Sequence, residues 1–145
     1  MRVTCAGILV ADIVRLYSQR AEPGRLVTLE EPLTLHVGGC AANTGISLAK
    51  MGVDVKIVGK LGNDYWGRFI IDTFREYPNI DVGSVKVDES ETTASTDIEV
   101  LKETGERTFY HFVGANASFC IDDISEDSYD CDVFHVGGYN LIPSV

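Results

Sequence analysis

Apolar and polar positions alternate along the chain with two different periods, which predicts alternating strands and helices. Every second residue is apolar in residues 33–37 and 53–57, as in strands with one buried face. Between them, residues 41–51 carry apolar side chains at helical spacing and end at a glycine. A second helical stripe over residues 66–77 ends at a proline. This alternation predicts a Rossmann-like α/β fold with an open, mostly parallel sheet flanked by helices.

The two ends of the chain carry further strand patterns. Apolar runs in residues 2–17 are broken at Asp12, so we expect a strand, a polar break and a second short strand. Two strand patterns in residues 96–113 surround a glycine-containing turn, which predicts a β-hairpin. Residues 132–136 predict one more short buried strand. The hairpin should form a small antiparallel appendage to the main sheet.

Composition narrows the functional classes. Apolar residues make up 45% of the 145 residues, enough for one domain with a core. The formal net charge is −10, and an acidic surface repels nucleic-acid phosphates and anionic lipids. The sequence contains no apolar run of about 18 residues, so we expect no membrane span. We predict a cytoplasmic protein that binds neither nucleic acid nor membrane.

Cysteine and histidine spacing gives no sign of a metal site. The four cysteines lack C-x-x-C spacing and have no paired histidines nearby. We therefore expect reduced, packed thiols and no bound metal. His36 and His135 lie within apolar runs, which favours packed core positions. For His111, on the predicted hairpin, a pocket position and a surface position both remain open.

The most specific candidate site is the double glycine before the first predicted helix. Gly38 and Gly39 allow a tight turn and a close approach of backbone to ligand. The helix that follows begins with unpaired N–H groups, and Asn43 adds a side-chain donor and acceptor. Together these features predict a pocket for a hydroxyl-rich small molecule.

Polar or glycine residues follow three of the predicted strands. They are Asp12, the pair at 38–39 and the pair at 137–138. Ligands of open α/β sheets bind beyond the carboxyl ends of the strands, so we expect the three to converge. Asp12 can accept two hydroxyl hydrogen bonds at once, as sugar binding requires. The alternative is that Asp12 caps a turn and that the glycines only form one.

These motifs together resemble the ribokinase-like, PfkB-type carbohydrate kinases. Residues 38–43 and 62–67 look like that family's first signature, and Asp12 stands where the family has its sugar-binding aspartate. Residues 105–109 look like the family's lid hairpin, and residues 114–116 like the stretch after it. The likeness runs in order along residues 1–145, which would be the N-terminal part of a ribokinase-like domain.

The resemblance implies a small-molecule ligand under a closing lid. The ligand would be a sugar or a nucleoside, and its binding residues would be Asp12, Gly38, Gly39 and Asn43. Lid strands within residues 11–37 and 94–113 would cover it. If Thr96 and Ile98 face the pocket, His111 shares that inward face on the partner strand. These three residues are the expected lid contacts.

The chain departs from the family pattern in two ways. Gly137 stands where some relatives have an acidic substrate contact, so this contact is absent or is made by Asn140. Family members are roughly twice as long, and their second half supplies the catalytic base and the ATP pocket. The resemblance therefore implies ATP and Mg²⁺ for a full-length enzyme, but no catalytic residue and no bound cofactor in this chain alone.

Two functions remain open from the sequence. The chain is either the sugar-binding half of an ATP-dependent carbohydrate kinase, inactive alone, or a short non-catalytic module that binds a sugar or nucleoside. A dinucleotide-binding domain fits poorly, because no G-x-G-x-x-G motif follows the first strand. The lid, or an unpaired edge at residues 132–136, should favour a homo-oligomer.

Overall fold

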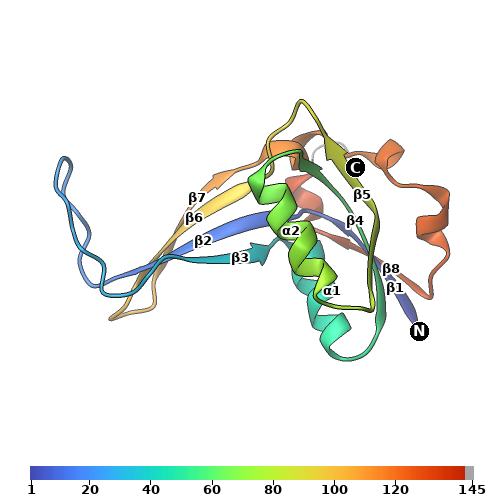
Figure 1. Cartoon of the computed structure of the whole chain (residues 1–145), viewed down its shortest axis with the longest axis horizontal. Helices are drawn as coiled ribbons and strands as arrows, with labels where there is room; N and C mark the ends of the chain where they lie inside the picture. Colours follow the sequence, from blue (N-terminus) through green and yellow to red (C-terminus); the bar gives the residue numbers. More distant parts are fainter. Residues whose placement is uncertain (143–145) are drawn as a thin grey trace.

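The computed structural model describes residues 1–142 and contains two sheets and two α-helices (Figure 1). The strands are β1 (Arg2–Gly7), β2 (Val10–Tyr17), β3 (Thr34–Gly38), β4 (Asp54–Gly62), β5 (Ile80–Asp88), β6 (Ser95–Leu101), β7 (Arg107–Phe112) and β8 (Val133–Gly137). The helices are α1 (Cys40–Lys50) and α2 (Tyr65–Arg75), with four short 3₁₀ helices, η1 (Gly114–Ser118), η2 (Ile121–Asp123), η3 (Glu126–Tyr129) and η4 (Tyr139–Leu141). No helix among residues 1–142 is long and apolar enough to cross a membrane.

The main sheet is entirely parallel and has the strand order β5-β4-β1-β8. Both α-helices pack on one face, where Ala42 of α1 and Phe74 of α2 join Cys5 of β1 in a common core. The opposite face is covered by the segment that holds the 3₁₀ helices between β7 and β8. Phe119, between η1 and η2, packs there against Val58 of β4. Parallel sheets are normally covered on both faces, and the predicted Rossmann-like class is confirmed.

The second sheet projects from this body and has the order β3-β2-β6-β7 (Figure 1); we call it the lid sheet. β2 pairs antiparallel with β3, and β6 pairs antiparallel with β7. Its two central strands, β2 and β6, are parallel. The lid sheet is therefore mixed, and the expected antiparallel hairpin is only one half of it.

The chain passes from the main sheet to the lid sheet at Ile8 and Leu9, and not at Asp12 as the polar pattern suggested. Asp12 is the third residue of β2. The backbone N–H of Leu9 donates to Asn116 Oδ1 (3.2 Å), and Asn116 Nδ2 donates to the Leu9 carbonyl (3.0 Å). Asn116 is only 1% exposed. A buried amide thus replaces the strand partner that Leu9 lacks at the bend.

A second junction joins α2 to the segment that leads into β6. Asp64 caps α2 by accepting the N–H of Gly67 (2.8 Å), and its other oxygen accepts the N–H of Thr93 (2.8 Å). The buried Thr93 hydroxyl in turn accepts the N–H of Gly62 (2.9 Å). Partial burial of Asp64 favours the neutral carboxyl, but the hydrogen bonds together lower its pKa below 3.8. The motif at residues 62–67 therefore fixes the base of the lid sheet.

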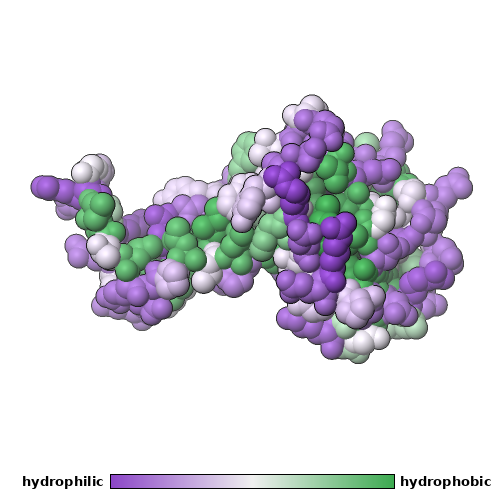
Figure 2. Space-filling view, viewed as in Figure 1, coloured by the Kyte–Doolittle hydropathy of each residue, from purple (hydrophilic) through white to green (hydrophobic). Residues whose placement is uncertain are grey.

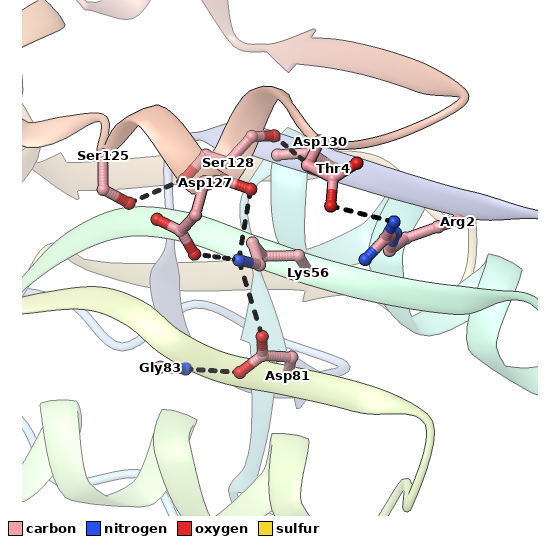
Figure 3. A network of polar contacts seen from close by, with 9 residues as sticks. All are labelled: Arg2, Thr4, Lys56, Asp81, Gly83, Ser125, Asp127, Ser128 and Asp130. Carbon is pink, nitrogen blue, oxygen red and sulfur yellow. Dashed lines mark hydrogen bonds and ion pairs between the residues drawn. The ribbon is translucent and has the colours of Figure 1, made fainter.

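A polar network lies at the amino ends of the main-sheet strands β1 and β4 (Figure 3). Thr4 of β1 donates its hydroxyl hydrogen bond to the carbonyl of Ser128 (2.7 Å), and both residues are buried. Lys56 of β4 forms ion pairs with Asp127 and Asp81. These contacts fasten η3 and β5 to the centre of the sheet.

One strand was missed, and two expectations about the burial of side chains are wrong. β5 was not predicted, because it is an edge strand with an irregular register around Gly83 and a mostly exposed or half-exposed pattern. His36 is exposed and not in the core. Of the four free cysteines only Cys5 is buried, and Cys40 is exposed. Burial raises the pKa of the Cys5 thiol to about 11.

Candidate functional site

Four polar residues form a row across the lid sheet. Asp12 of β2 pairs directly with His36 of β3 on one side and with Thr96 of β6 on the other. Thr96 pairs in turn with His111 of β7. Directly paired residues of neighbouring strands point to the same face of a sheet, so all four side chains share one face. We call this set the polar row.

The rest of this face is largely apolar. Two residues away from the polar row on each strand, Val14, Ile98 and Phe109 stand side by side in register. Val14 and Ile98 are half-buried, and Phe109 is 55% exposed. An apolar surface with a few placed polar groups is typical of small-molecule sites. Arg15, Asp97 and Glu99 point to the opposite face, where they form ion pairs.

The Asp12 carboxyl is half-buried, and its surroundings act on its pKa in opposite directions. Burial raises its pKa above the ordinary value of 3.8. The Thr96 hydroxyl beside it has the largest effect that opposes burial, and attraction to His111 and His36 also lowers the pKa. An acceptor with little water around it is suited to receive hydrogen bonds from ligand hydroxyl groups.

Gly38 makes room for the Asp12 carboxylate. A Cβ added at Gly38 would lie only 1.9 Å from Asp12 Oδ2, so the carboxylate occupies the space beside the glycine backbone. Gly39 has φ +94°, a left-handed value that favours glycine, and a Cβ there would lie 2.3 Å from the Ile8 carbonyl oxygen. Both glycines are thus required by close contacts with the β1–β2 segment.

The three strand-end features surround the start of α1. Gly39 is the N-cap of α1, and no side chain caps this end of the helix. The end of β8 lies against the same turn, because a Cβ added at Gly137 would lie 2.6 Å from the Ala41 nitrogen. Asp12, through its contact with Gly38, lies on the other side of the double glycine. The structure thus brings Asp12, both glycine pairs and the helix start together.

Asn43 is less closely tied to this group. It lies in the first turn of α1, and its backbone N–H donates to the Gly39 carbonyl (2.9 Å). Its side chain is exposed and makes no hydrogen bond with Asp12 or any other described residue. Asn140, in η4, is also exposed. The roles of Asp12, Gly38, Gly39 and Asn43 in binding, and of the lid residues, stay predictions.

His36 is the member of the polar row that the sequence analysis did not select. Its Nε2 lies 2.9 Å from Thr34 Oγ1. The signal that identifies it is its pairing opposite Asp12, and this pairing is visible only once β2 and β3 are known to be neighbours. Period-two alternation alone did not show which strands pair.

A separate cavity of about 600 Å³ lies on the opposite face of the lid sheet. It is lined by Arg15, Tyr17, Arg20, Glu99 and Tyr110, together with residues of the β2–β3 loop. None of the predicted site residues lines it. Arg15 and Arg20 form ion pairs with Glu99 of that face, so we place the candidate site at the polar row.

The described residues offer hydrogen-bonding groups but no metal site. No group of three or more His, Cys, Asp or Glu side chains among residues 1–142 is arranged to hold a metal ion. The polar row can accept and donate hydrogen bonds, and the apolar residues beside it can pack against carbon atoms. This arrangement can bind and orient a small alcohol.

The sequence matches the model of the pfkB family of carbohydrate kinases over residues 1–144. A 5-dehydro-2-deoxygluconokinase of Clostridium perfringens is 32% identical over 94 residues, covering 63% of this chain and 28% of that protein. A ribokinase of Staphylococcus aureus is 28% identical over 123 residues, covering 85% of this chain and 40% of the ribokinase.

Solved structures agree with these matches. The crystal structure of a fructokinase with bound ATP from Xylella fastidiosa is similar with a TM-score of 0.73 and 26% identity. The similarity covers 93% of this chain and 41% of the fructokinase. The chain thus spans less than half the length of each of these relatives.

Proposed function

The chain belongs to the pfkB family of carbohydrate kinases, and we propose that it forms the sugar-binding side of an ATP-dependent kinase. The observation that carries the proposal is the polar row on an otherwise apolar face, next to the double glycine. Asp12 would accept hydrogen bonds from sugar hydroxyls, while the backbone of Gly38 and Gly39 packs against the ligand. Asn43, with a free side chain, would bind a further hydroxyl. The lid sheet would close over the sugar.

ATP and Mg²⁺ do not fit the residues described here. Phosphoryl transfer needs groups that position the γ-phosphate and neutralise its charge. Residues 1–142 contain no cluster of metal-binding side chains, and the sequence has no Walker-type phosphate loop. We therefore assign nucleotide, Mg²⁺ and catalytic base to the part of the relatives that this chain does not span. This chain alone should bind sugar without transferring phosphate.

A recombinant polypeptide matching the rest of a relative would test this division of roles. Mixed with this chain, it should restore ADP release that depends on both ATP and sugar. No activity from a folded mixture would favour the alternative, a non-catalytic binding module. In either case the polar row is the proposed binding surface.

We also propose that the chain self-associates. The lid sheet exposes Phe109 and Phe112, each 55% exposed, and the edge strand β8 exposes Val133 and Val136. Figure 2 shows apolar residues along the projecting sheet and on the loop at its tip. Exposed apolar surface and unpaired strand edges both favour contact with another copy.

A thermal-shift screen tests sugar binding directly. Fructose, ribose, their epimers and a nucleoside should be compared, because a ligand at about a hundred times its Kd stabilises a protein by about 2.7 kcal/mol. We expect at least one to raise Tm, and Asp12→Ala and Asn43→Ala to abolish the rise. Asp97→Asn, on the opposite face of the same sheet, is the matched control and should keep it. Unchanged binding by both site variants would refute the assignment.

A further inference from the structure

The cavity on the face of the lid sheet opposite the polar row is lined by an excess of positive charge. Its volume of about 600 Å³ is within the range of small-molecule sites. Three arginines, Arg15, Arg20 and Arg25, belong to its lining, and Glu99 is the only carboxylate among the described residues that line it. The chain as a whole has a net charge of −10. A local excess of cations in an acidic chain favours the binding of an anion at this place.

Two of the three arginines have acidic partners. Arg15 of β2 forms ion pairs with Asp97 and with Glu99 (3.5 Å) of β6. Arg20 lies 2.9 Å from a Glu99 carboxyl oxygen, and its Nε donates a hydrogen bond to the Tyr17 hydroxyl (3.1 Å). Glu99 is thus shared between two guanidinium groups, which weakens its repulsion of an incoming anion.

Hydrogen-bond donors remain without a partner at two positions of the cavity. Arg25, in the loop between β2 and β3, makes no ion pair within residues 1–142. The Nε of Arg15 is buried and has no hydrogen-bond partner in the described part of the chain. A buried N–H without a partner is unfavourable, so a water molecule or a ligand group is expected beside it. Guanidinium groups bind carboxylates and phosphates especially well, because they can offer two parallel N–H donors.

Much of the remaining lining is apolar or aromatic. The loop between β2 and β3 contributes Leu26 and Val27, which are 88% and 42% exposed. β7 contributes Tyr110, which is 57% exposed. Large apolar surfaces that are this exposed gain free energy when a ligand removes them from water. The lining therefore combines free cationic donors with an apolar contact surface.

We propose that this cavity binds a small organic anion, in which a carboxylate or phosphate ester is attached to an apolar or aromatic body. The oxyanion accepts hydrogen bonds from Arg25 and from Arg15 Nε, and the body packs against Leu26 and Tyr110. The site does not depend on the proposed sugar site, because it lies on the opposite face of the lid sheet and selects for a charge that a neutral sugar lacks.

The test is amide chemical-shift mapping of this chain with four probes. Phenyl phosphate and phenylacetate combine an oxyanion with a ring, whereas inorganic phosphate and benzyl alcohol each have only one of the two features. We expect a ring-bearing anion to shift the amides of Arg15, Arg25, Leu26 and Tyr110. Its Kd should be at least about tenfold lower than that of either incomplete probe, because it gains both the charge and the apolar contact. The tighter of the two ring-bearing anions identifies the ligand as a phosphate ester or a carboxylate.

Arg25→Gln should weaken binding of the ring-bearing anion about tenfold, since it removes a hydrogen bond to a charged group. Arg25 is exposed in a loop, so the variant should fold normally. Arg107→Gln is the matched control. Arg107 is also exposed, but it pairs with Val100 and so lies on the other face of the lid sheet. This variant should bind within about threefold of the unmodified chain.

Three results would overturn the proposal: no shift at the cavity with any probe, an incomplete probe that binds as tightly as the ring-bearing anions, or equal weakening in Arg25→Gln and Arg107→Gln. Anion binding should persist in Asp12→Ala, the variant expected to abolish sugar binding. The two sites can therefore fail separately, and a chain that binds the anion but no sugar would contradict only the proposed function.

Discussion

At Asp12, ligand binding and folding stability make opposite demands on one side chain. The carboxylate lies in a half-buried position, filling the space beside Gly38, where it can accept hydrogen bonds from a ligand. The same burial disfavours its charge in the folded protein. Binding residues commonly reduce stability in this way. The cost should be measurable from the pH dependence of unfolding.

Asp12→Asn should become more stable relative to the unmodified chain as the pH rises. The pKa of Asp12 is raised above 3.8 in the folded state, so its favourable contribution is present below that pH. It is lost as the pH rises through the folded-state pKa. Urea unfolding of both proteins at several pH values checks this. A stability difference that does not vary with pH would contradict it.

Single residues were predicted from the sequence where a local motif pointed to them, and missed where the signal lay in strand pairing. The sequence selected Asp12, Gly38 and His111; in the structure Gly38 lies against Asp12, and His111 stands in the same row across the lid sheet, while their roles in binding stay predictions. It assigned His36 to the core because apolar residues surround it in the sequence, and this was wrong. Such a run indicates burial only where both faces of the strand are covered. β3 belongs to the projecting lid sheet, and the face that carries His36 is exposed.

At the scale of elements, the hydrogen bonds of Asp64 link helix, sheet and lid. Asp64 caps α2 and also binds the backbone of Thr93, which precedes β6 by two residues. One carboxylate thus connects the segment that leads into β6 with the N-terminus of α2. The glycines on either side of Asp64, at positions 62 and 67, let the two backbones approach.

Asp64→Ala should lower the free energy of unfolding by about 1–2 kcal/mol at neutral pH, as for other N-cap removals. The pKa of Asp64 is lowered in the folded state, so its contribution is present above 3.8 and is lost as the pH falls through the folded-state pKa. The difference from the unmodified chain should therefore shrink in acid, the opposite trend to Asp12→Asn. Urea unfolding across the same pH series measures both. A difference that grows in acid would exclude this role.

The elements with strong local periodicity were predicted well. α1 and α2 were located by their apolar stripes, and their ends by a glycine and a proline. The β1–β2 boundary was misplaced, because Asp12 looked like a polar break, while the real bend is set by Asn116, 107 residues away from Leu9. The parallel pairing of β2 with β6 was missed for the same reason: no local pattern encodes which distant strands meet.

At the scale of the whole molecule, the two sheets present apolar surface in two different places. One is the lid sheet, with Phe109 and its neighbours, and the other is the unpaired edge at β8. Each offers a different mode of self-association. Charges on edges and faces are the usual means by which proteins prevent such contacts, so introduced charges can separate the two modes.

Sedimentation velocity over a roughly hundredfold range of concentration should show reversible association. Phe109→Lys should abolish it if the lid sheets pair, and Val136→Lys if the β8 edges pair. Ile121→Lys, at an exposed apolar position on η2, adds the same single charge and is the matched control. A monomer at every concentration would contradict the proposed self-association.

The most direct test of sugar recognition is an amide chemical-shift map of this chain titrated with the sugar that the thermal screen selects. NMR detects weak binding. We expect binding to be weak because the proposed enzyme would complete the site with the part of the relatives that this chain does not span. We predict shifts that cluster at Asp12, Gly38, Gly39 and Thr96, and that vanish in Asp12→Ala. Shifts gathered around Arg15 and Tyr110, at the cavity on the opposite face, or no shifts at any sugar concentration, would contradict the account.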